Sequence, residues 1–165
     1  MVQLRRHLPI AAAFVLGACA ATAVQSSASP PSTASSNDAP GPAKHEISPP
    51  VTMAEQAETR VSPNGKARVT ILARGINAFV AKLEMEAGAA VPEHRDATEE
   101  YIHVLEGSGT MMIDDQEHAL APGATVYMPA NATVSFQNGD SPLVGLQVFA
   151  GPEPADKYDA WTPLP

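Results

Sequence analysis

The sequence has a single cysteine, Cys19, so the chain cannot form an internal disulfide. Basic residues are scarce as well. There are 10 lysines and arginines against 18 aspartates and glutamates, a formal net charge of -8 at pH 7. A negatively charged surface repels phosphate groups. This balance argues against nucleic acid as a partner and against membrane binding through the protein's own surface.

Two common catalytic motifs are absent from the sequence. It contains no Gly-x-Ser-x-Gly nucleophile motif and no glycine-rich phosphate loop of the Gly-Lys-Ser or Gly-Lys-Thr type. These absences exclude the usual serine hydrolase and phosphate-loop nucleotide-binding classes, and they direct attention to what the chain does contain.

The first residues have the three parts of an export signal. Two arginines precede an apolar run over residues 8–16, and two small residues follow before Cys19. The stretch Leu-Gly-Ala-Cys at 16–19 resembles the bacterial lipobox, whose cysteine is lipidated and becomes the first residue after cleavage. The alternatives are an ordinary secretory signal and an uncleaved anchor that runs to about residue 24.

The lipobox resemblance implies a location. Residues 1–18 would be removed as a signal peptide, and Cys19 would carry the lipid. Ala20 stands where an aspartate would imply retention at the inner membrane, so we expect an anchor in the outer membrane, facing the periplasm. Cleavage removes two arginines and no acid, which moves the net charge from -8 to -10. A cysteine used as an anchor also leaves none for a Cys–His nucleophile pair.

A linker follows the predicted anchor. In the stretch 25–43, 14 of 19 residues are serine, proline or alanine. Such a composition cannot bury a core, so we expect residues 19–43 to be a disordered tether. The expected folded domain then covers 44–151, followed by a proline-rich tail at 152–165. We expect this tail to pack Tyr158 and Trp161 back on the domain, because exposing both rings would be costly.

The segment 44–151 reads almost entirely as strand and turn. Short apolar or alternating runs recur, separated by glycine, proline or aspartate turns, and one helix-like stretch at 53–59 lies outside the series. Short strands at such regular spacing predict a sandwich or a barrel. The predicted strands cover 67–72, 78–85, 101–105, 110–113, 125–128, 133–136 and 144–149.

The stretch from Gly88 to Gly107 resembles the first motif of the cupin family. That motif reads glycine, five residues, His-x-His, three or four residues, glutamate, six residues, glycine. His94 and Glu100 stand at the matching positions between the two glycines. One residue type departs from the pattern, because Asp96 stands where the second histidine belongs.

A second stretch resembles the other cupin motif, which reads glycine, five residues, Pro-x-Gly, two residues, histidine, three residues, asparagine. Gly123, Pro129 and Asn138 match, while Asn131 replaces the glycine and Val134 replaces the histidine. The resemblance implies an all-β fold, a cupin-type jelly-roll β-barrel in a single domain, with room inside for one small ligand.

The resemblance also implies site residues. In a complete cupin site three histidines and one glutamate hold a divalent ion such as manganese, iron or zinc, and the matching positions here are His94, Asp96, Glu100 and Val134. His94, Asp96 and Glu100 could still form a two-carboxylate, one-histidine site. Alternatively the metal has been lost, and His94, Glu100 and Val134 line a ligand site together with Ile102, which alternation places on the face of Glu100.

Two classes of function fit these features. One is a membrane-anchored binding module that holds a small molecule or partner in the barrel, which the apolar Val134 favours. The other is an enzyme, either metal-dependent through His94, Asp96 and Glu100 (dioxygenase, isomerase or decarboxylase type) or metal-free with His94 and Glu100 as acid and base. The fold alone hosts many chemistries and cannot choose between them. By analogy with other cupins, we expect a homodimer.

Overall fold

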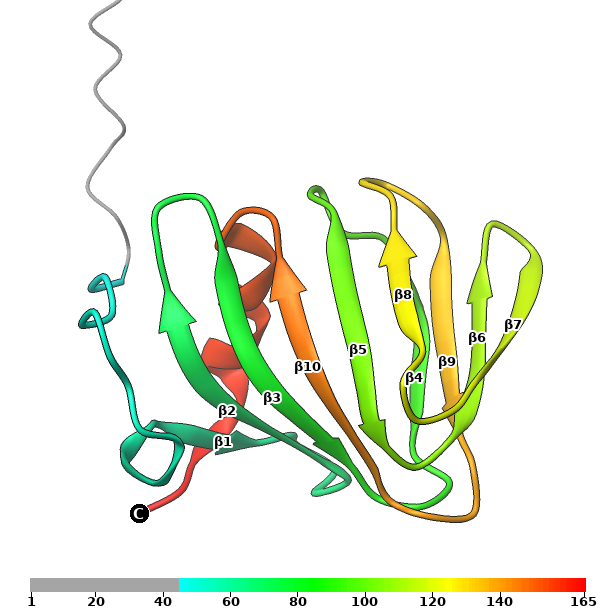
Figure 1. Cartoon of the computed structure of the whole chain (residues 1–165), viewed down its shortest axis with the longest axis horizontal. Helices are drawn as coiled ribbons and strands as arrows, with labels where there is room; N and C mark the ends of the chain where they lie inside the picture. Colours follow the sequence, from blue (N-terminus) through cyan, green and yellow to red (C-terminus); the bar gives the residue numbers. More distant parts are fainter. Residues whose placement is uncertain (1–44) are drawn as a thin grey trace, which may run out of the picture. The chain divides into compact units, whose positions relative to one another are not determined.

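A computed structural model describes residues 45–165 (Figure 1), so the predicted export signal, Cys19 and the linker to 43 lie outside the described residues. No helix within 45–165 is long and apolar enough to cross a bilayer. The elements, in chain order, are η1 (Ala54–Gln56), β1 (Thr59–Val61), β2 (Ala67–Arg74), β3 (Phe79–Met85), β4 (Ala90–His94), β5 (Glu100–Glu106), β6 (Gly109–Ile113), β7 (Gln116–Leu120), β8 (Thr125–Met128), β9 (Val134–Asn138), β10 (Leu143–Phe149), η2 (Glu153–Ala160) and β11 (Thr162–Pro163).

The strands form two antiparallel sheets, which confirms the predicted all-β fold. One sheet has seven strands in the order β11-β1-β2-β3-β10-β5-β8, and the other has four in the order β4-β9-β6-β7. Strands that are neighbours in a sheet are often distant in sequence; β10, for example, lies between β3 and β5. Two antiparallel sheets whose neighbouring strands are distant in sequence are typical of a jelly roll.

Alternation of buried and partly exposed side chains places the core between the sheets. Along β3, every second residue from Phe79 to Met85 is buried, and β10 alternates in the same way. The main core cluster takes side chains from both sheets, including Leu83, Val104 and Phe136. A second cluster joins Phe79 of β3 and Phe149 of β10 to Tyr158 of η2.

The segment after residue 151 packs on the barrel, as predicted for its aromatic side chains. Tyr158 is 3% exposed and its ring centroid lies 5.9 Å from that of Phe79 and 4.9 Å from that of Trp161. The segment is not a loose tail, however. It forms η2, which lies alongside β3 and β10 (Figure 1), and then β11, which pairs with β1.

The sequence missed three of the four edge strands and also β1, but it predicted the edge strand β8 at 125–128. β4 and β7 are the two edge strands of the four-stranded sheet, and β11 is an edge of the other. β4 contains Pro92, and most residues of β7 are exposed and polar. Edge strands commonly carry such residues, which removes the alternation on which the prediction relied. The helix-like stretch at 53–59 is only the short η1, with β1 beginning at Thr59.

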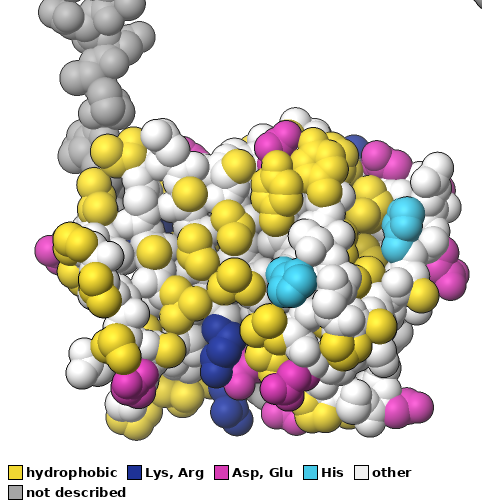
Figure 2. Space-filling view, in the orientation of Figure 1, with side chains coloured by type: hydrophobic (Ala, Val, Ile, Leu, Met, Phe, Trp, Pro, Cys, Tyr) yellow, Lys and Arg dark blue, Asp and Glu magenta, His cyan; other side chains and the backbone are white. Residues whose placement is uncertain are grey.

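Apolar side chains also reach the outer face of the seven-stranded sheet. Figure 2 shows them spread among polar groups over that face. Two of the larger ones are Tyr127, which is 49% exposed, and Leu146, which is 36% exposed. Tyr127 packs its ring 5.3 Å from that of Tyr101, and both hydroxyls donate hydrogen bonds to Glu99.

Candidate functional site

A cavity of about 600 Å³ lies between the two sheets. Most of its wall is apolar, with Leu83 and Val104 from the seven-stranded sheet facing Met111 and Phe136 from the four-stranded one. These side chains belong to the main core cluster, so the cavity is an unfilled part of the barrel interior. Small-molecule sites are typically concave and mostly apolar, with few polar groups.

The four motif positions converge on one end of this cavity. His94 ends β4, Glu100 begins β5, Val134 begins β9, and Asp96 lies in the loop between the first two strands. His94 and Val134 are direct partners in the pairing of β4 with β9. Ile102, two residues after Glu100, also lines the cavity. The cupin spacing therefore places these positions together although two of the residue types have changed.

Asn131, which replaces a motif glycine, adopts the backbone conformation that glycine would supply. Its φ is +62°, in the left-handed region that asparagine tolerates better than most residues. Its backbone N–H donates to the carbonyl oxygen of Asp96 at 2.7 Å, and its carbonyl accepts from Arg95. The turn thereby holds the loop that carries Asp96.

Three ionisable side chains meet at the polar end. The ligating atoms of His94, Asp96 and Glu100 all lie within 4.8 Å of one another. His94 Nε2 is 3.9 Å from Asp96 Oδ2. His94 Nδ1 lies 2.9 Å from the carbonyl oxygen of Pro92, which can only accept, so Nδ1 carries a hydrogen. In the neutral ring, the Nε2 lone pair then faces Asp96.

Glu100 is buried and held by two further side chains. It is 5% exposed, and its Oε1 accepts a 2.6 Å hydrogen bond from Gln147 Nε2. Gln147 Oε1 in turn accepts from the Tyr158 hydroxyl at 2.7 Å. Burial raises the pKa of Glu100 above its ordinary value, although the bond from Gln147 and the charge of Lys157 oppose the shift. Burial likewise raises the pKa of Tyr158.

A lysine from η2 completes the polar end. Lys157 Nζ lies 3.0 Å from Asp96 Oδ2 and 4.8 Å from the centre of the Phe149 ring. Sequence reasoning missed Lys157, Gln147 and Tyr158 because no cupin motif covers them. The one available signal for Lys157 was that it is the only lysine or arginine after Arg95.

These residues do not fit a complete four-ligand metal site. Three of the four motif positions offer ligating atoms. Val134 is 4% exposed and offers none, and the ammonium of Lys157 already pairs with Asp96. Three protein ligands can hold a metal when water completes its coordination, but here one of the three, Asp96, is already paired with a cation.

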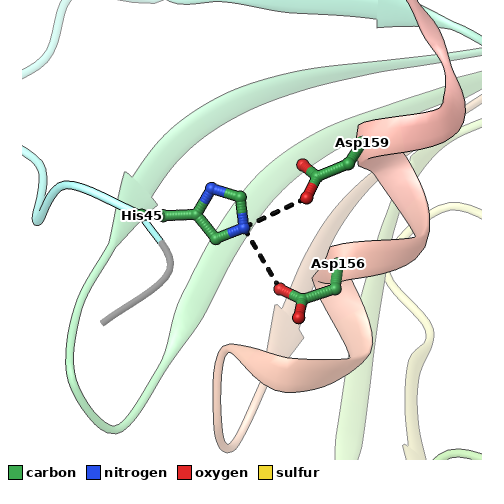
Figure 3. Close-up of side chains that lie close together, drawn as sticks. All are labelled: His45, Asp156 and Asp159. Atoms are coloured by element: carbon green, nitrogen blue, oxygen red, sulfur yellow. Dashed lines mark ion pairs between the residues drawn. The ribbon is translucent and has the colours of Figure 1, made fainter. Parts of the chain in front are cut away.

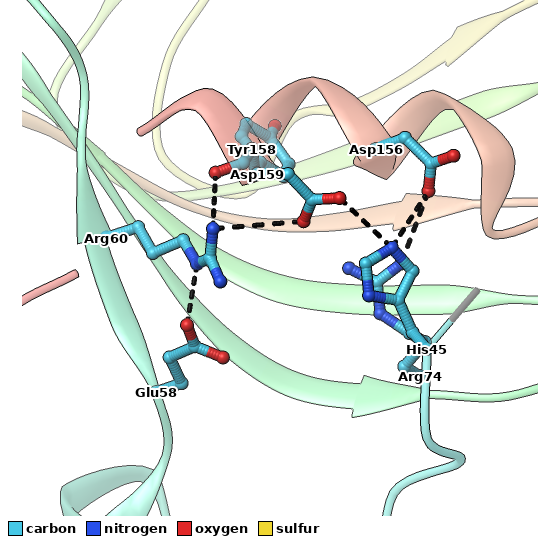
Figure 4. A network of polar contacts seen from close by, with 7 residues as sticks. All are labelled: His45, Glu58, Arg60, Arg74, Asp156, Tyr158 and Asp159. Atoms are coloured by element: carbon cyan, nitrogen blue, oxygen red, sulfur yellow. Dashed lines mark hydrogen bonds and ion pairs between the residues drawn. The ribbon is translucent and has the colours of Figure 1, made fainter. Parts of the chain in front are cut away.

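A second cluster lies on the outer side of η2. His45 Nε2 is 3.3 Å from Asp156 Oδ1 and 3.1 Å from Asp159 Oδ2 (Figure 3). Guanidinium groups approach the same carboxylates, with Arg74 Nη1 3.7 Å from Asp156 and Arg60 Nη1 3.8 Å from Asp159 (Figure 4). Cations already balance both carboxylates, so we interpret the cluster as an ionic contact that fixes η2 to β1, β2 and the segment at His45.

Comparison with known proteins places the fold. Residues 81–149 match the family model described as "Cupin domain". An RmlC-like cupin from Shewanella frigidimarina aligns with a TM-score of 0.60 at 17% identity, over 65% of this chain and 95% of that one. A predicted oxalate decarboxylase from Thermotoga maritima aligns with a TM-score of 0.56 at 17% identity, over 61% and 98%.

A third similar structure is the polyketide cyclase RemF from Streptomyces resistomycificus, with a TM-score of 0.53 at 18% identity, over 59% of this chain and 76% of that one. At such identities the likeness shows a shared fold and carries no activity to this chain. A search of the curated proteins found none that matches it.

Proposed function

Because the chain contains a cupin domain, we propose that it is a binding module that holds a small organic molecule inside the barrel. The cavity of about 600 Å³ between the sheets carries this proposal. It lies within the range of roughly 300–1,000 Å³ found for small-molecule sites. His94, Glu100, Ile102 and Val134 all line it and would contact the ligand.

The walls indicate the class of ligand. The wall of the cavity is mostly apolar, so it favours a ligand whose larger part is apolar. At the polar end, Lys157 and Asp96 neutralise one another, and Nε2 of the neutral His94 ring can accept a hydrogen bond. A ligand with one uncharged polar group, such as a hydroxyl or an amide, would satisfy this end without a buried unpaired charge.

The anchor is the second part of the proposal. Supported by the lipobox resemblance at 16–19, we propose that Cys19 is lipidated and tethers the domain to the outer membrane, facing the periplasm. Cys19→Ser should leave the precursor uncleaved at this site or the product unlipidated, which changes membrane partitioning or gel mobility, whereas Thr22→Ser should change neither. Membrane partitioning and gel mobility that stay the same in Cys19→Ser would contradict the lipobox interpretation.

Native mass spectrometry of the full-length protein, purified from its own source in detergent, tests ligand binding. We expect a bound small molecule in the wild type. Val134→Phe, which fills the polar end of the cavity, should lose that molecule, while Leu146→Phe on the outer face should retain it. Circular dichroism must show that both variants are folded, because overpacking a core can destabilise it.

Metal analysis of the same material separates this proposal from the enzyme alternative. Stoichiometric manganese, iron or zinc that is lost in His94→Ala would favour a metal-dependent cupin enzyme using His94, Asp96 and Glu100. An organic ligand without stoichiometric metal would favour the binding module.

A further inference from the structure

Lys157 occupies a position that the cupin motifs do not predict. It comes from η2, outside the stretch of 88–138 that carries the motifs, and its ammonium reaches into the group formed by His94, Asp96 and Glu100. We infer that the ammonium group of Lys157 occupies the place of a divalent metal ion in this barrel. It thereby excludes metal from the three ligating side chains. This inference is independent of the organic ligand proposed above.

The first support is the partnership between Lys157 and Asp96. Their charged atoms lie 3.0 Å apart, and the Asp96 side chain is only 16% exposed. This pairing explains the aspartate at position 96, where the cupin pattern has a histidine. A histidine at position 96 would leave the ammonium without an anionic partner, whereas the aspartate supplies one. A metal bound to Asp96 would instead stand beside an ammonium, and the two positive charges would repel each other.

The second support is that the ammonium is held in place. Lys157 Nζ lies over the Phe149 ring at 4.8 Å, a geometry in which the face of the ring attracts a cation. The neighbouring Tyr158 is buried and donates its hydroxyl to Gln147. On the other side of η2, Asp156 and Asp159 contact His45 (Figure 3). These contacts fix η2, and with it the backbone of Lys157, beside the cluster.

The third support is the lost ligand opposite His94. Val134 is the cross-strand partner of His94 and stands where the cupin pattern has a histidine. Its side chain is buried and apolar and offers no ligating atom. A metal that displaced Lys157 would meet three protein ligands instead of four, and water would have to complete its coordination. The missing fourth ligand therefore weakens the competition of a metal with the Lys157 ammonium.

Titration of the full-length protein with Zn²⁺ or Mn²⁺ alone, by calorimetry and by competition with a chromogenic chelator, tests the inference. Lys157→Met should bind at least about tenfold more tightly than the wild type, because the competing charge is gone. Lys157→Arg keeps the charge and should bind as weakly as the wild type. Lys157→Gln gives a second neutral side chain in case methionine disturbs η2.

Two further variants complete the design. Lys82→Met is the matched control: the Lys82 side chain is exposed to the same 38% and pairs at 3.1 Å with Glu84, also on β3, so the metal affinity of this variant should equal that of the wild type. Adding His94→Ala to Lys157→Met should abolish the gain, which places the metal at this cluster. Equal affinity in the wild type and both neutral variants, whether tight or weak, would overturn the inference. Loss of the organic ligand alone would leave it intact.

Discussion

Asn131 shows how a departure from a family pattern can preserve a structure. The motif glycine is replaced, but the backbone keeps a φ of +62°, and the two hydrogen bonds that join residue 131 to residues 95 and 96 use its backbone atoms. The side chain itself is exposed. The physical requirement at this position is therefore the left-handed conformation, and it does not depend on a particular side-chain contact.

We expect Asn131→Val to lower the free energy of unfolding by about 1–2 kcal/mol, because a β-branched residue is strained at positive φ. Asn131→Gly should change it by less than about 0.5 kcal/mol. Urea denaturation measures both. A valine variant as stable as the glycine variant would show that the turn relaxes to negative φ.

The raised pKa of Glu100 should make the stability of the folded protein depend on pH. Burial raises its pKa above the ordinary value of 4.5, so the folded protein binds this proton more tightly than the unfolded chain does. This contribution to stability is therefore present at low pH and is lost as the pH rises from 4.5 through the raised pKa. Glu100→Gln keeps the shape and the acceptor for Gln147 but cannot ionise.

The free energy of unfolding of Glu100→Gln, relative to the wild type, should thus increase from about pH 4 to about pH 7. Denaturation at several pH values in the presence of a chelator measures it. A difference that stays constant with pH would mean that Glu100 ionises in the folded protein as it does in the unfolded chain.

Among the elements, those predicted from the sequence are the strands buried on one face. β2, β3, β5 and β10 alternate, and alternation is visible without a structure. The edge strands β4, β7 and β11 have little apolar surface to bury, and η2 depends on contacts far along the chain. Prediction from sequence therefore found the strands that bury one face, including the edge strand β8, and missed β1, β4, β7, β11 and η2, which lack a local pattern of this kind.

The same division holds for the candidate site. His94, Asp96, Glu100 and Val134 share one cavity because strand register fixes them, and motif spacing encodes register. Their binding role stays a prediction. Lys157 could not be placed in this way, because its position follows from the docking of η2 and from no local pattern.

Arg74 joins β2 to η2, and its removal should loosen that helix. Its side chain is 9% exposed, its Nη1 lies 3.7 Å from Asp156, and its guanidinium lies 5.0 Å from the centre of the Phe79 ring. Arg74→Met should lower the free energy of unfolding by about 1–3 kcal/mol, because it leaves a partly buried carboxylate with less compensating charge.

Hydrogen exchange should locate the effect of Arg74→Met in η2. Arg68→Met is the control, since Arg68 lies on the same strand but is exposed, and it should change neither stability nor exchange. Faster exchange spread evenly over both sheets would indicate a general loss of packing, and it would contradict a specific link between Arg74 and η2.

For the whole molecule, the tether and the barrel should be energetically separate. The core clusters are formed by residues from Ala67 onward, and the serine- and proline-rich stretch has little apolar surface to add. Deletion of residues 26–39 should leave the melting temperature within a few degrees of the wild type, as scanning calorimetry can measure. A larger drop, on the order of 1 kcal/mol for a domain of this size, would mean that the stretch packs on the barrel.

The pairing of β11 with β1, and the contact of His45 with Asp159, hold the first and last segments of the described chain on the same side of the barrel. The described chain begins at one end of that side, and the C-terminus lies at the other (Figure 1). A glycine-serine linker long enough to run along this side could join Pro165 to His45, and new ends could be made between Asp114 and Asp115, in the tight turn from β6 to β7. Such a circular permutant should keep the cavity and every strand pair, and a tether could then be joined to the turn between β6 and β7 in place of residue 45.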